Sequence, residues 1–76
     1  MDLTDTERRL LGYLAAHRER VVSKTQILTA VWGYDGFADN LVEVNVSALR
    51  RKLEAQGQER VLHTVRGRGY RLSATG

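Results

Sequence analysis

Two basic clusters are the residues of this chain best suited to chemistry with a partner. Positions 50–52 hold three consecutive Arg or Lys residues, and Arg66 and Arg68 flank a glycine. Clustered arginines of this kind bind polyanions, because each guanidinium can pair with a phosphate. A second interpretation stays open at this point: Arg50 and Glu54 have the i,i+4 spacing of an ordinary salt-bridged helix surface.

The charge of the chain is unevenly distributed. The 76 residues include 12 Lys or Arg and 9 Asp or Glu, which gives a net charge of +3. Residues 1–43 contain five basic and seven acidic residues, whereas residues 44–76 contain seven basic and two acidic ones, so the net charges are −2 and +5. The basic part contains both clusters, and the asymmetry indicates a polyanion-binding face there.

The other reactive side chains do not form a catalytic or metal-binding pattern. Ser23 and Ser47 have no histidine and aspartate at a predictable distance, so neither is expected to be a nucleophile. The chain has no cysteine, and His17 and His63 are too far apart to build a zinc site alone. The Gly-Arg-Gly at 67–69 lacks the strand-turn-helix context of a phosphate loop. We therefore expect no enzyme, no metal site and no cofactor.

The compartment follows from two features of the composition. A chain without cysteine suits a reducing cytosol. The longest charge-free apolar stretch, Leu10 to Ala16, is far too short to span a bilayer, and no signal peptide opens the sequence. We expect a cytoplasmic protein with no membrane partner.

A chain of this length is expected to form one domain, residues 1–76, because it can enclose only one small core. Capping boxes that start at Thr4 and Ser23 open the first two helices, and Asn40 is the expected N-cap of the third. An arginine-tipped β-hairpin follows, which must pack on the helices to be stable. The predicted bounds are about 5–18, 24–32 and 41–55 for the helices and about 61–72 for the hairpin.

The third predicted helix has two distinct faces at about 100° per residue. Its apolar face, which we expect in the core, consists of Val42, Val46, Leu49 and Leu53. Its outward face is small and weakly polar, bounded by Arg50 and Lys52, and consists of Val44, Ser47, Ala48 and Arg51. Such a face is narrow enough to enter a groove.

Five segments, in this order, carry a family pattern: Leu3-Thr4-x-x-Glu7, Val21-Val22-Ser23-Lys24, Ile27-Leu28-x-x-Val31-Trp32-Gly33-Tyr34, Asn40-Leu41-Val42-Glu43-Val44-x-Val46-Ser47-x-Leu49-Arg50-Arg51-Lys52-Leu53 and Thr64-Val65-Arg66-Gly67-x-Gly69-Tyr70-Arg71-Leu72. Together they resemble the output domain of OmpR/PhoB-type response regulators, and they cover nearly the whole chain. The resemblance implies a mainly α fold with a small β-hairpin, the three-helix winged helix-turn-helix.

The resemblance also implies roles for individual residues on duplex DNA. The family's third helix lies in the major groove, which assigns base reading to Val44, Ser47, Ala48 and Arg51. The family's wing arginine enters the minor groove and corresponds to Arg66, with Arg68 as a second candidate. Phosphate contacts that fix the register are implied for Trp32, Asn40, Arg50, Thr64, Arg68 and Tyr70.

The function implied by the resemblance is sequence-specific DNA binding in a bacterial transcriptional regulator, and a dimer on DNA is compatible with it. The alternative is a winged-helix module that binds a partner protein, such as RNA polymerase, through the loop at 34–39. RNA binding through the arginine tip is less favoured, because the tip lacks an aromatic stacking platform.

The sequence departs from the family pattern at its start. Relatives usually begin with a four-stranded antiparallel sheet, and most follow a phosphorylatable receiver domain, whereas this chain begins at the last residues of that sheet, 1–3. We expect either a trimmed fragment or a naturally shortened regulator. In both cases, control by phosphorylation is not expected of this polypeptide.

Overall fold

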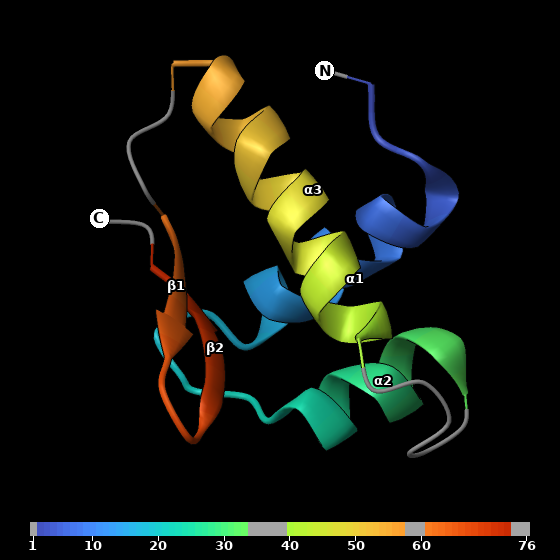
Figure 1. The fold of residues 1–76 in the computed structure, drawn as a ribbon, viewed down its shortest axis with the longest axis vertical. Coiled ribbons are helices and arrows are strands. Elements are labelled where there is room, and N and C mark those ends of the chain that lie inside the picture. The colour runs from blue at the N-terminus through green and yellow to red at the C-terminus, as the bar shows by residue number, and fades with distance from the viewer. Residues whose placement is uncertain (1, 34–39, 58–60, 74–76) are drawn as a thin grey trace.

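The computed structural model describes residues 2–33, 40–57 and 61–73. Within these ranges the chain forms three helices followed by an antiparallel hairpin (Figure 1). The elements are α1 (Asp5–Ala16), α2 (Lys24–Trp32), α3 (Leu41–Ala55), β1 (Leu62–Val65) and β2 (Gly69–Leu72). The predicted mainly helical winged helix-turn-helix order is confirmed.

Both predicted capping boxes are present. The Thr4 hydroxyl accepts a hydrogen bond from the Glu7 amide at 3.1 Å, and the Glu7 carboxylate accepts one from the Thr4 amide at 2.9 Å. Ser23 and Gln26 repeat the arrangement at the start of α2, with bonds of 3.1 and 2.9 Å. Each box satisfies two backbone amides that a helix start would otherwise leave without a partner.

The first helix ends two residues earlier than predicted, at Ala16 instead of position 18. Glu19 adopts a positive φ of 69°, and its amide donates to the carbonyl of Leu72 at 2.7 Å. The chain therefore leaves the helix in order to pair with the hairpin, and this long-range bond overrides the local helical pattern.

The predicted N-cap position of Asn40 is confirmed, but a side-chain cap is missing. The side chain of Asn40 makes no capping hydrogen bond. Its backbone has φ −101° and ψ 5°, whereas a capping side chain reaches the helix amides from an extended backbone.

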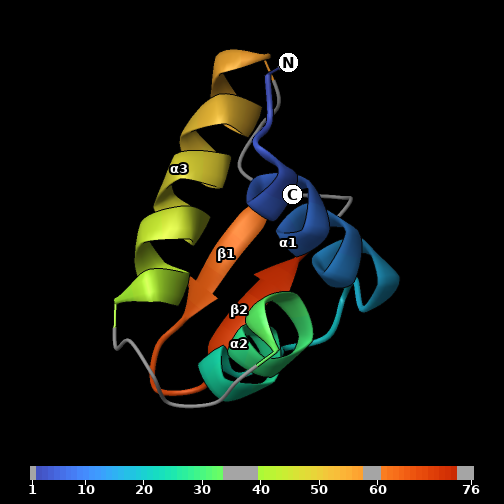
Figure 2. The same ribbon diagram turned by 90° about the vertical axis from the view of Figure 1, so that its right-hand side faces the viewer.

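The core lies where the three helices and the hairpin meet. All four predicted core residues of α3 are buried, and so are Leu62 and Tyr70 of the hairpin. Val22 forms an isolated bridge with Tyr70, through amide-to-carbonyl bonds of 2.8 and 2.9 Å, which ties the hairpin to the link before α2. Figures 1 and 2 show the hairpin beside α3, with α2 near the N-terminal end of α3. The third helix and the tip of the hairpin can therefore contact the same partner.

Candidate nucleic-acid interface

The outward face of α3 has the helical phase that the sequence predicts. Among the described residues, Val44 is the single large hydrophobic residue that is exposed, with 57% of its surface accessible. Ser47 and Arg51 are also exposed, and Ala48 is half-buried. An exposed valine between small and basic side chains gives this face one apolar contact point.

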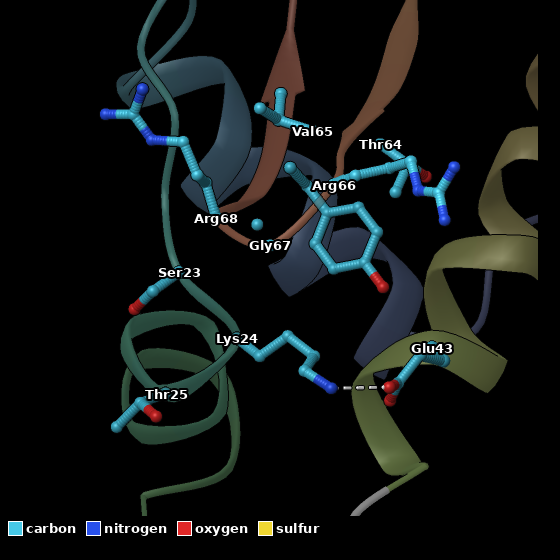
Figure 3. A pocket seen from close by; sticks show the side chains of 11 residues that line it. Ser23, Lys24, Thr25, Glu43, Thr64, Val65, Arg66, Gly67 and Arg68 are labelled. Carbon is cyan, nitrogen blue, oxygen red and sulfur yellow. Dashed lines mark hydrogen bonds and ion pairs between the residues drawn. The ribbon is translucent and has the colours of Figure 1, made fainter.

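The tip of the hairpin presents two arginines on a tight turn. The Arg68 amide donates to the carbonyl of Val65 at 3.0 Å, and Gly67 and Gly69 have positive φ values of 74° and 147°. Glycine adopts such positive φ values without steric cost, because it has no Cβ. Figure 3 shows the side chains of Arg66 and Arg68 extending in opposite directions, with Arg66 on the side of α3.

A cleft of about 550 Å³ separates the hairpin from the starts of α2 and α3 (Figure 3). Its floor contains an ion pair that joins the two helices, in which Lys24 Nζ lies 2.7 Å from Glu43 Oε2. The hydrogen bond from Lys24 lowers the pKa of Glu43. The lining residues are Ser23, Lys24, Thr25, Glu43, Thr64, Val65, Arg66, Gly67, Arg68, Gly69 and Tyr70.

Arg50 joins α3 to the hairpin. Its Nε donates to the carbonyl of Leu62 at 3.0 Å, and its Nη2 donates to the Thr64 hydroxyl at 2.7 Å. Both acceptors lie on β1, so Arg50 links two elements and is not only a surface residue of its own helix. The wing arginines line the cleft, whereas the outward-face residues of α3 are not among those that line it.

The profile of the family described as "Transcriptional regulatory protein, C terminal" matches residues 1–72. The chain belongs to this family of OmpR/PhoB-type output domains. It is 55% identical over 73 residues to the transcriptional regulatory protein PrrA of Mycobacterium tuberculosis. The aligned segment covers 95% of this chain and 31% of PrrA. The chain thus spans about a third of the length of the curated relatives it matches.

Solved structures of output domains have the same fold. The DNA-binding domain of AdeR, in complex with an intercistronic region, has a TM-score of 0.86 at 33% identity, over 96% of this chain and 74% of that one. The DNA-binding domain of Klebsiella pneumoniae RstA, in complex with the RstA box, has a TM-score of 0.84 at 27% identity. The match covers 95% of this chain and 73% of the RstA chain. Members of this family are DNA-binding transcription regulators, not enzymes.

The output domain brings only part of the predicted phosphate-contacting set to the cleft. Thr64 and Tyr70 line the cleft with the wing arginines, although Tyr70 is only 6% exposed. Burial, and secondly the nearby Glu43 charge, raise the pKa of Tyr70. Trp32 packs half-buried against the core and Asn40 is exposed, and neither lines the cleft.

Two lysines of the output domain have partners that sequence reasoning missed. Lys52, predicted at the border of the outward face, donates to Glu7 Oε1 at 2.6 Å and to the Asp2 carbonyl at 2.8 Å. Lys24 pairs with Glu43 on the cleft floor. No local spacing could have revealed these pairs, because their members are far apart in the sequence.

The remaining predictions concern absent features and a loop. Within residues 2–33, 40–57 and 61–73, no group of three or more His, Cys, Asp or Glu could hold a metal ion. Among the described helices, none has both the length and the apolar character that a membrane crossing requires. The loop at 34–39, which the alternative interpretation assigns to a partner protein such as RNA polymerase, lies outside the described residues.

Proposed function

We propose that this output domain binds duplex DNA sequence-specifically, with α3 in the major groove and the wing in the adjacent minor groove. The observation that carries the proposal is the outward face of α3, where Val44 and Arg51 are exposed beside an arginine-tipped wing. The AdeR and RstA domains, which share the fold, are in complexes with DNA. A helix with small residues on its outer face can approach base edges closely.

The outward face of α3 offers both apolar and polar contacts to bases. The methyl groups of Val44 and Ala48 suit the C5-methyl of thymine, and Arg51 can pair with the two acceptors of guanine. The Ser47 hydroxyl can donate or accept and therefore discriminates less. Base reading by this helix accordingly rests on one arginine and two apolar contacts.

The wing is suited to read groove shape. A narrow A·T-rich minor groove has an enhanced negative potential, which attracts an inserted guanidinium. Arg66 is exposed and lies on the side of α3, so it can enter the groove next to the one that α3 occupies. Arg68 extends the other way and suits a backbone phosphate.

Phosphate contacts would hold the domain in register between these two grooves. The Thr64 and Tyr70 hydroxyls line the cleft beside the wing arginines, and hydroxyls are common donors to phosphate oxygens. Asn40 and Trp32 are proposed for the same role at the edge of α3 and the end of α2. Arg50, which the resemblance placed among the phosphate-contacting residues, is bonded to the hairpin, and we propose that it supports phosphate binding from that position.

The test is a binding titration of labelled random duplex DNA at several salt concentrations, followed by selection of bound sequences from a pool. We expect log affinity to fall linearly with log salt concentration, because bound cations release counterions. Arg51→Ala should relax base preference at one position and cost about 1–3 kcal/mol on the selected site. The matched control is Arg9→Ala, which removes an exposed arginine of α1. No salt-dependent DNA binding by the parent, or equal effects of the two variants, would refute the proposal.

A further inference from the structure

Besides the shared core, a single guanidinium of α3 forms two hydrogen bonds with the wing. Arg50 donates from Nε to the Leu62 carbonyl at 3.0 Å and from Nη2 to the Thr64 hydroxyl at 2.7 Å. Leu62 and Thr64 lie two residues apart on β1, and the guanidinium reaches the backbone carbonyl of the first and the side chain of the second. A planar group held at two points fixes both the spacing and the angle between helix and strand.

The second of these bonds restricts the hydrogen bonding of the Thr64 hydroxyl. A guanidinium can only donate, so Thr64 Oγ1 must act as the acceptor toward Arg50. A hydroxyl has one proton, which must then point to a different atom. Among the described residues, the bond from Arg50 is the sole hydrogen bond of the Thr64 side chain, and Thr64 is exposed and lines the cleft.

We infer that Arg50 is a positioning residue, which orients the Thr64 hydroxyl so that its proton is donated to a DNA phosphate. The inference deepens the proposed DNA binding and rests on it. Thr64 lines the cleft, so its O–H donor is available to an anionic acceptor there, and the adjacent guanidinium strengthens this donor by polarising it. Arg50 thus acts on DNA through Thr64, whereas a direct phosphate ligand would act on its own.

The first test is a double-mutant cycle of DNA affinity with Arg50→Met, Thr64→Val and the double variant at about 0.15 M salt, where exposed charges are screened beyond about 8 Å. Each single change should weaken binding about tenfold, the value of one hydrogen bond to a charged group. In the Thr64→Val background, Arg50→Met should cost no more than about twofold. Thr64→Ser, which keeps the hydroxyl, should restore most of the affinity lost in Thr64→Val.

The second test identifies the acceptor and does not require any Arg50 variant to fold. Neutral methylphosphonates are placed at single backbone positions of the selected duplex. At one backbone position, the methylphosphonate should weaken DNA binding by the parent protein. At the same position it should hardly change the affinity of the Thr64→Val variant, which has already lost this contact. Independent losses in the cycle, or additive losses at every methylphosphonate position, would overturn the inference while the parent still binds. A parent without salt-dependent binding would instead refute the proposed function itself.

Discussion

Replacing Gly69 with alanine should detach the wing from the segment that precedes α2. A Cβ built at Gly69 would overlap the carbonyl oxygen of Val22 and lie 2.7 Å from its carbonyl carbon and 2.9 Å from Ser23 Cα. All three atoms belong to the backbone, so no side chain can rotate away to make room. The backbone at Gly69 also has a φ of 147°, which side-chain-bearing residues rarely adopt.

The magnitude follows from the strain and from the bonds at the clash. A residue forced into such a backbone conformation costs about 1–3 kcal/mol. The two bonds between Val22 and Tyr70, at 2.8 and 2.9 Å, lie beside the overlap and would break, at about 0.5–1.5 kcal/mol each. The total is roughly 2–6 kcal/mol. A domain of this length has a free energy of unfolding of roughly 4–11 kcal/mol, so the loss is a large share of it.

The assay is urea unfolding followed by circular dichroism, with Gly67→Ala as the matched control. Gly67 has a φ of 74°, but a Cβ there meets no heavy atom within 4 Å. Its replacement should therefore cost only the left-handed strain of about 1–2 kcal/mol. Equal losses in the two variants, or a smaller loss for Gly69→Ala, would show that the close approach to Val22 does not anchor the wing.

Three further predictions concern the core, an ion pair and the wing. Leu49→Ala should cost about 2–5 kcal/mol in urea unfolding, whereas Arg51→Ala should leave folding intact; the reverse would mean that the helical phase is wrong. The pKa of Glu7 is lowered first of all by the hydrogen bond from Lys52, so this carboxylate stabilises the fold above its usual pKa of 4.5 and the contribution is lost as pH falls through the lowered value. Glu7→Gln should accordingly be less stable than the parent at pH 7, with a gap in melting temperature that narrows in acid and vanishes below the lowered pKa; a gap independent of pH would contradict this. Arg66→Lys should keep the salt slope but lose preference for A·T-flanked over G·C-flanked sites, because ammonium is more strongly hydrated, and unchanged discrimination would exclude Arg66 from the minor groove.

Features governed by local chemistry could be predicted from the sequence. The capping boxes at Thr4 and Ser23 depend on residues three positions apart, and both are present. The two faces of α3 follow from helical geometry, so the burial of Leu49 and the exposure of Val44 agree with the pattern. The positive φ of Gly67 follows in the same way from the demands of a short turn.

Features governed by tertiary contacts could not be predicted in this way. The early end of α1 depends on the bond from Glu19 to Leu72, near the other end of the chain. The missing side-chain cap at Asn40 reflects the backbone with which the chain enters α3, which no residue type specifies. The partner of Arg50 lies on a strand 12 to 14 residues away, so spacing alone favoured the nearby Glu54.

The basic charge of the C-terminal part divides into two roles that composition does not separate. Arg50 and Lys52 donate hydrogen bonds within the protein. Arg50 bonds to the hairpin, and Lys52 bonds to Glu7 in the first turn of α1. Arg51, Arg66 and Arg68 are exposed on α3 and the wing. The first group holds α3 next to the wing and to the start of α1, and the second group is the one that we propose to contact DNA. An arginine can read a groove only at the right distance from its neighbours, so the two cations bonded within the fold would set how well the exposed arginines discriminate.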